Sequence, residues 1–447
     1  MAEAPPIDAL ARRRRQYRFM AAAVAVTIPG SIISRAHTDI SYPLLALIFG
    51  LAIVGAAFML SWAAEVAQLD ISAGLAIAVL AFIAVLPEYA VDLVLALSGG
   101  EAYKEFGPAC QSAADIAAGR ESDCALALAN MTGANRLLIG LGWTMVVFIA
   151  WRRYKVLRGE RMESVTLERT HAVELSYLSV ATVYSLTLPL KNSITLIDSV
   201  VLVSLFVLYM VRISKAPAEE PHLVGPAEAL GQLDKVKRRA AVIGLFLFAA
   251  VVILLCAEEF AHALKETGAD FGISEFFLIQ WLAPLASEAP ELLIAGLYAY
   301  RLNTNAGLGT LVSSKVNQWT LLVGTLPIAF AIASSSLDGL PIIARQREEV
   351  FLTAAQSLFA VVVLINLSMS LREAGALFTL FWAQFLAGAV VPEQHHDTEL
   401  ILFGVIYIVL ALVVLAGSRR EVPRLLKDGF RTKYSDLVAA DPPHQGH

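Results

Sequence analysis

Charged residues are scarce in this 447-residue chain. Asp, Glu, Lys and Arg make up only 16% of it, whereas 57% of the residues are hydrophobic and the mean hydropathy is +0.65. This composition excludes a soluble enzyme and predicts an all-α membrane protein. The small net charge of −5 is spread over loops and tails, which offers no surface for nucleic acid and leaves membrane lipid as the expected surroundings.

Cysteines and the common enzyme motifs are also few. Cys110 and Cys124 lie at the predicted outer side, where they either form a disulfide that closes the outer loop or stay free, and Cys256 is expected in the apolar core. The sequence contains neither GxxxxGK[ST] nor HExxH, which argues against a nucleotide-driven pump and an intramembrane metalloprotease. No cofactor is expected, so any transport would need an ion gradient.

Apolar stretches follow one another along the chain, and a helix that crosses a bilayer needs about 20 such residues. The 18 prolines and 28 glycines are compatible with interrupted membrane helices, because neighbouring helices satisfy the backbone groups that these residues free. We predict about twelve spans, near residues 17–34, 43–66, 71–97, 124–150, 171–190, 193–211, 239–260, 272–300, 306–332, 350–371, 374–391 and 399–417.

Lys and Arg are concentrated in every second connection between the spans, which predicts the orientation in a cell (inner) membrane. Both termini and residues 212–238 are expected in the cytoplasm, and residues 98–123 outside. Arg345 and Arg347 are exceptions on the predicted outer side. Residues 212–238, rich in Pro, Ala, Glu and Lys, are predicted to form a flexible linker.

The parts of the chain on either side of this linker resemble each other. Leu86-Pro87-Glu88 in one corresponds to Ala289-Pro290-Glu291 in the other, and a span with several polar residues follows each. Five spans per half would place the halves in opposite orientations, as inverted repeats. The predicted units are an N-terminus with one extra helix (1–42), the first five-helix repeat (43–211), the linker (212–238), the second repeat (239–391), and one extra helix with a cytoplasmic tail (392–447).

Each Pro-Glu pair combines two features that favour a cation. The proline withdraws an amide donor, so the carbonyl of Ile83 or Ala286 loses its partner, while the adjacent Glu supplies negative charge. Calcium takes about 6 to 8 oxygen ligands. An ionised Glu at mid-membrane costs roughly 3 kcal/mol, which requires a function or a partner. The alternative is a protonated Glu bonded to a backbone carbonyl.

Other polar residues accompany these pairs. Glu288 shares a helix face with Glu291, and Asp92 lies one turn beyond Glu88. Asp92 and Glu288 could instead face a water-filled vestibule, and the amides and hydroxyls could simply join helices. The predicted cation ligands are Glu88, Glu291, Glu288, Ser287, Asn130, Asn135, Ser314, Asn317, Gln318 and Asp92.

These motifs resemble the calcium/cation antiporter superfamily, the membrane region of sodium/calcium exchangers. Members have two inverted five-span repeats, each with a Gly-Thr-Ser-Leu-Pro-Glu type motif and a Gly-Asn-x-x-Gly-Ser-Asn type motif, and a cytoplasmic linker. The resemblance covers roughly spans two to eleven and includes Ala257-Glu258-Glu259-Phe260. It implies that Glu88 and Glu291 are the central ion-binding carboxylates.

The sequence departs from the family pattern at several ligand positions. Ala84-Val85 and Ser287-Glu288 stand where the family has Thr-Ser, and Leu138 stands where a polar ligand is usual. Lys315 replaces an Asn; its ammonium could occupy the place of a transported cation or pair with Glu288 or Glu291.

We therefore predict a secondary antiporter, not an enzyme, that exchanges calcium or a similar cation for protons or sodium by alternating access. The missing hydroxyls and the extra Glu288 favour protons over sodium. The alternative is a non-transporting membrane scaffold or sensor on a decayed exchanger fold. The sequence leaves the oligomeric state open.

Overall fold

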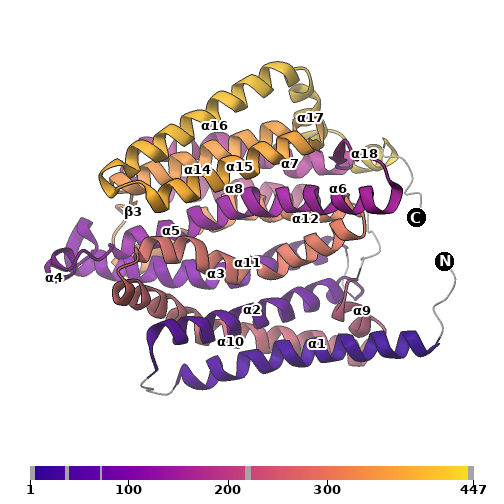
Figure 1. Cartoon of the computed structure of the whole chain (residues 1–447), viewed down its shortest axis with the longest axis horizontal. Coiled ribbons are helices and arrows are strands. Elements are labelled where there is room, and N and C mark those ends of the chain that lie inside the picture. Colours follow the sequence, from indigo (N-terminus) through magenta and orange to yellow (C-terminus); the bar gives the residue numbers. More distant parts are fainter. Residues whose placement is uncertain (1–5, 36–39, 71–72, 217–222, 441–447) are drawn as a thin grey trace.

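The computed structural model describes residues 6–35, 40–70, 73–216 and 223–440, without the side chains of 6–10, 73–85, 344, 389 and 393. Long helices run roughly side by side along the longest dimension of the molecule (Figure 1). Within the described residues, eight helical segments are long and apolar enough to cross a membrane. The architecture is that of an all-helical, multi-pass protein.

Eighteen α-helices follow in chain order. They are α1 (Pro6–Ile33), α2 (Tyr42–Ala67), α3 (Ala73–Phe106), α4 (Ala113–Ala117), α5 (Asp123–Leu137), α6 (Thr144–Arg158), α7 (Ala172–Ser185), α8 (Leu196–Ile213), α9 (Pro226–Gly231), α10 (Lys235–Phe271), α11 (Glu275–Tyr300), α12 (Thr304–Asn317), α13 (Val323–Ser334), α14 (Ala344–Val363), α15 (Leu371–Val390), α16 (His396–Ser418), α17 (Glu421–Phe430) and α18 (Tyr434–Ala440).

Two π-helical segments join helices into longer units. Leu138–Trp143 connects α5 to α6, and Gln318–Leu322 connects α12 to α13. Short 3₁₀ segments lie at Gly107–Ala109, Arg169–His171, Leu188–Leu190, Leu364–Asn366 and Glu393–His395. Each of the twelve predicted spans falls on one of these helical units, although the number of membrane crossings stays a prediction.

Four short strands pair across the two halves of the chain. The strand β1 (Ser164–Thr166) pairs antiparallel with β4 (Ser368–Ser370), and β2 (Ser193–Ile194) pairs with β3 (Leu340–Pro341). In each ribbon, a connection of the first half is therefore fixed to a connection of the second half.

The described part of the linker is folded against the helices. The start of α1 and the end of α18 lie at the same end of the molecule as α9, and we call this the linker end (Figure 1). Glu228 of α9 receives hydrogen bonds from Arg12 at 2.8 and 2.9 Å and from Gln16 at 2.9 Å. At this end, hydrogen bonds from Arg238 also hold the pKa of Asp70 below its usual range. The prediction of a flexible linker is therefore wrong for residues 223–234, because polar contacts and α9 fix them.

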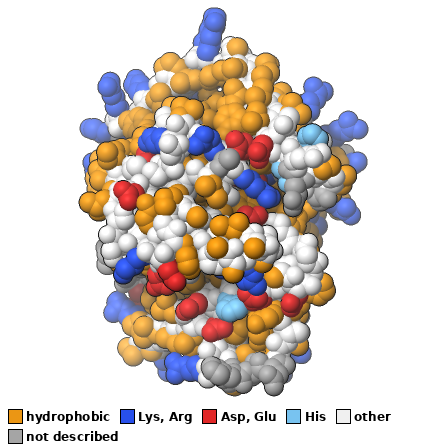
Figure 2. All heavy atoms as spheres, turned by 90° about the vertical axis from the view of Figure 1, so that its left-hand side faces the viewer, with side chains coloured by type: hydrophobic (Ala, Val, Ile, Leu, Met, Phe, Trp, Pro, Cys, Tyr) orange, Lys and Arg blue, Asp and Glu red, His pale blue; other side chains and the backbone are white. Residues whose placement is uncertain are grey.

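The opposite end carries the disulfide between Cys110 and Cys124, and we call it the disulfide end. Figure 2 shows this end, where acidic and basic side chains lie together and hydrophobic side chains cover much of the flanks. Arg345, one of the exceptions to the charge pattern, pairs here with Glu121 at 3.3 Å. Its charge is therefore balanced locally.

Cys256 is buried and free, as expected for core packing.

The first helix packs along the second. A Cβ at Gly55 of α2 would lie 2.7 Å from the carbonyl oxygen of Ala23 in α1, so glycine is needed for this close approach. The helix α1 is thus an integral part of the bundle.

The charge pattern predicts which end faces the cytoplasm. Ser214 at the linker end and Ala118 at the disulfide end are both exposed, so a cysteine at either position should be accessible from one side only. An impermeant thiol reagent added outside intact cells should label Ala118→Cys and leave Ser214→Cys unlabelled. The reverse pattern would overturn the predicted orientation.

Candidate functional site

Glu88 of α3 and Glu291 of α11 each directly follow a proline inside their helix, Pro87 or Pro290. Glu88 is only 4% exposed. The two helices pack against each other, and the two carboxylates are near enough to interact electrostatically. The structure therefore brings together, in the interior, the two residues that the sequence singles out.

Gln318, at the start of the π-helical segment after α12, connects the carboxylates of the two halves. Its amide nitrogen donates to Glu88 Oε2 at 3.4 Å and to Glu288 Oε1 at 2.5 Å. The hydroxyl of Ser314, one turn earlier, hydrogen-bonds Glu291. Three predicted acidic ligands thus meet two predicted neutral ligands at one place.

The first half contributes a second polar pair. Asn130 of α5 donates to Asp92 Oδ1 at 2.8 Å, and both side chains are buried. Asp92 also interacts electrostatically with Glu88. The helix α5 reaches this region because it crosses α11 at Gly133, where a Cβ would lie 1.7 Å from the carbonyl oxygen of Gln280. Only glycine permits that approach.

Lys315 is fully buried, and the structure records no ion pair between it and Glu288 or Glu291, which is one of the two roles that the sequence leaves open for this residue. Its ammonium instead donates to Asn135, to the side-chain oxygen at 2.6 Å and to the backbone carbonyl. It still interacts electrostatically with Glu88 and Glu288. Lys315 therefore offsets the acidic charge from a short distance, and the Asn135 carboxamide oxygen is engaged with Lys315 in this structure.

The remaining predicted positions are placed as follows. The hydroxyl of Ser287 donates to carbonyls of its own helix at 3.2 Å, and Asn317 is buried next to Gln318. Ala84 and Val85, which replace the family's Thr-Ser pair, lie outside the described side chains, as does the side chain of Ile83.

Several buried oxygens at this place have no donor. An oxygen that can only accept hydrogen bonds costs about 1 to 3 kcal/mol when it is buried without a donor. Such oxygens are also the ligands that a hard cation requires. Among the described residues, no compact group of three or more His, Cys, Asp or Glu side chains is arranged to hold a metal ion. Among those residues, the oxygens without a hydrogen-bond partner include Glu88 Oε1, Asp92 Oδ2, Asn130 Oδ1, Glu288 Oε2, Glu291 Oε2 and Gln318 Oε1.

A cavity of about 210 Å³ reaches Glu291 of this cluster. Pro87, Ser287, Pro290 and Glu291 line it beside the carboxylate cluster. The wall continues along α2, α11 and α12, and includes polar side chains toward the end of α2. The cluster is therefore connected to space large enough for several water molecules.

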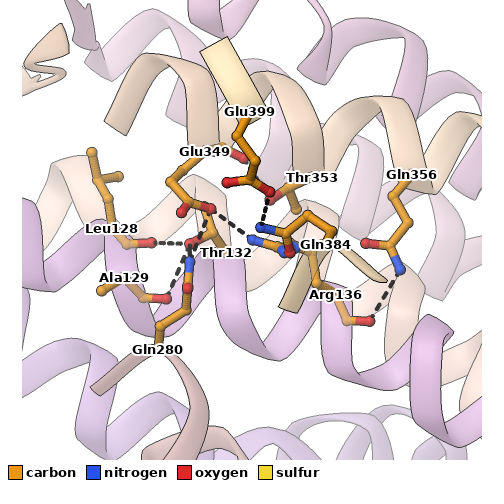
Figure 3. A network of polar contacts seen from close by, with 10 residues as sticks. All are labelled: Leu128, Ala129, Thr132, Arg136, Gln280, Glu349, Thr353, Gln356, Gln384 and Glu399. Carbon is orange, nitrogen blue, oxygen red and sulfur yellow. Dashed lines mark hydrogen bonds and ion pairs between the residues drawn. The ribbon is translucent and has the colours of Figure 1, made fainter. Parts of the chain in front are cut away.

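A second polar network, which the sequence interpretation missed, surrounds Arg136 (Figure 3). Its Gln280 precedes Glu288 in α11 and is nearer the disulfide end, where Arg120 lies close to Glu275 at the start of that helix. Arg136, which is 2% exposed, pairs with Glu349 at 2.7 Å and donates to Gln384. Gln280 donates to Glu349 at 3.0 Å, and Gln384 donates to Glu399 at 3.1 Å. This network joins α5 to α11, α14, α15 and α16. The sequence indicates this network only through single polar residues within apolar spans. Such residues suggest a functional site inside the membrane.

The chain belongs to the sodium/calcium exchanger protein family, whose sequence model matches residues 40–215 and 241–415. It is thus an integral, multi-pass membrane protein of the calcium/cation antiporter superfamily. Among solved structures, it is similar to the H⁺/Ca²⁺ exchanger CAX, with 39% identity, a TM-score of 0.82, and coverage of 96% of this chain and 100% of that one.

A second similar structure is the Ca²⁺/H⁺ antiporter protein YfkE, with 15% identity and a TM-score of 0.54 over 89% of this chain and 100% of that one. At that identity the likeness concerns the fold alone. The search of curated proteins found no match.

The buried ion pair predicts a large effect on stability. Arg136→Met would leave the Glu349 carboxylate buried without its cation, which costs about 3 to 5 kcal/mol. We expect a clearly lower melting temperature in detergent for Arg136→Met. The double variant Arg136→Met/Glu349→Leu should regain much of the loss, because it removes the uncompensated charge. A double variant no more stable than the single one would contradict the importance of the pair.

Proposed function

We propose that this protein is a secondary active antiporter that exchanges calcium, or a similar cation, for another cation. The observation that carries the proposal is the set of donorless oxygens around Glu88, Glu288 and Glu291, reached by the cavity from one side. Buried carboxylates without donors favour a cation. The similarity to the H⁺/Ca²⁺ exchanger CAX supports the same class of substrate.

Alternating access is supported by the relation between the two halves. The family model matches the chain twice, once on each side of α9. A π-helical segment follows Asn135 by a few residues in one half and begins at Gln318 in the other. Each two-stranded ribbon pairs one strand of the first half with one strand of the second half. If the two halves were interchanged, the ribbon β1–β4 would take the place of β2–β3, and the ribbon β2–β3 that of β1–β4. Inverted repeats of this kind let one binding site face either side in turn.

For the counter-ion we favour protons over sodium. Glu88, Glu288 and Glu291 interact with one another electrostatically, and a proton needs only one carboxylate. Sodium would need several neutral oxygens, but Ser287 is hydrogen-bonded to its own helix and Asn135 is engaged with Lys315. The 39% identity to an H⁺/Ca²⁺ exchanger points the same way.

The surroundings follow from this function. The working protein is embedded in lipid, in a cell membrane, with both termini and the linker end in the cytoplasm. Its partners are inorganic cations, and it requires no cofactor.

The first functional prediction concerns the central carboxylates. Glu88→Gln and Glu291→Gln each remove a charge without changing volume, so we expect loss of calcium exchange in proteoliposomes while the protein stays folded. Glu373→Gln, at the start of α15 and remote from the cluster, is the matched control and should exchange at the wild-type rate. Full flux in either central variant would contradict the site.

The second concerns the counter-ion. Calcium uptake should follow an imposed pH gradient, and Glu288→Gln should slow it at least tenfold, because one of the three interacting acids is removed. Uptake driven by a sodium gradient alone, unchanged in Glu288→Gln, would show that protons are not the coupling ion.

A non-transporting scaffold would behave differently in both experiments. Such a protein would show no flux under any gradient, and calcium would not raise the melting temperature of the purified wild type.

A further inference from the structure

The cavity that reaches Glu291 has an acidic residue at its far end. Glu65 lies near the end of α2, and Ser61, Gln68, Tyr298 and Thr310 line the same cavity. The polar lining therefore continues from the central cluster to the linker end. Glu65 was not among the residues expected from the sequence, because it stands at the edge of a predicted span.

One oxygen of Glu65 is held and the other is not. Oε2 accepts a hydrogen bond from the backbone nitrogen of Val224 at 3.1 Å. Oε1 is buried and receives no hydrogen bond from any residue that the structure describes. Arg301 and Glu228 both interact with Glu65 electrostatically, and they pair with each other at 3.6 Å. Their opposite charges offset each other, and Glu65 itself forms no ion pair with a residue that the structure describes.

The folded linker positions this carboxylate. Val224 lies just before α9, whose Glu228 binds Arg12 and Gln16 of α1 and Arg301 after α11. The backbone at Val224 is thereby fixed between the helices on both sides of the cavity. The hydrogen bond from Val224 to Oε2 then holds the Glu65 carboxylate in place.

We propose that Glu65 is a cation-access site, where a partly hydrated cation binds on its way between the linker end and the Glu88–Glu291 cluster. The cavity of about 210 Å³ has room for such an ion with several waters. Hydroxyl and amide side chains in the wall supply neutral oxygens, as hard cations require. This inference rests on the proposed exchange function. It assigns a role to a residue outside the central cluster, and that role concerns access from one side of the membrane only.

The decisive variant is Glu65→Gln. Its carboxamide oxygen can still accept the hydrogen bond from Val224, so the linker contact is kept while the charge is lost. The matched control is Arg12→Gln, which weakens the contact between α1 and the linker at Glu228 and leaves Glu65, Glu228 and Arg301 intact.

The test measures initial rates of calcium exchange in inside-out and right-side-out membrane vesicles. With calcium presented at the linker end, Glu65→Gln should raise the KM roughly fivefold, the effect of losing one attractive charge near the ion. With calcium presented at the disulfide end, the KM should be unchanged. The stabilisation of the purified variant by calcium should also equal that of the wild type, since the central cluster is intact.

Three results would overturn the proposal: an unchanged KM at the linker end, an equal rise on both sides, or the same one-sided rise in Arg12→Gln. The last would show that linker docking, and not the charge of Glu65, controls access. Absence of exchange in the wild type is a distinct result, because it would refute the antiporter function itself and this inference with it.

Discussion

Burial of negative charge between α3 and α11 is the constraint on which the rest of the site depends. Glu88, Glu288 and Glu291 lie close together between packed helices, and each charge there needs a compensating partner. The protein supplies only part of that compensation. Gln318 donates to Glu88 and Glu288, and Lys315 contributes positive charge from beside Asn135.

The incomplete compensation explains the arrangement around the cluster. If Lys315 bonded the carboxylates directly, it would offset more of their charge, and a transported cation would gain less by binding. Asn135 keeps the ammonium away from them. A transported cation can then complete the charge balance when it binds and disturb it when it leaves, which is what exchange requires. The network of Arg136 and Glu349 fixes α5 on the disulfide side of this cluster, while the cavity extends on the other side.

Much of this could be predicted from the sequence, for identifiable reasons. The prolines before Glu88 and Glu291 mark interrupted helices, and apolar length locates the helices that carry them. The partner of Lys315 could not be predicted, because helix periodicity gives the face of one helix but not its register against another. The docking of residues 223–234 could not be predicted either. Their composition resembles a flexible linker, but Glu228 pairs with Arg12, which is far away in the sequence.

The central claim is that the donorless oxygens around Glu88, Glu288 and Glu291 hold the transported cation. The most direct measurement is an experimental structure of the protein soaked with strontium, with the ion located by its anomalous signal. The account predicts a peak within about 2.3 to 2.7 Å of carboxylate oxygens of this cluster, absent in Glu291→Gln. A peak elsewhere with this cluster unliganded, or one that persists unchanged in the variant, would contradict it.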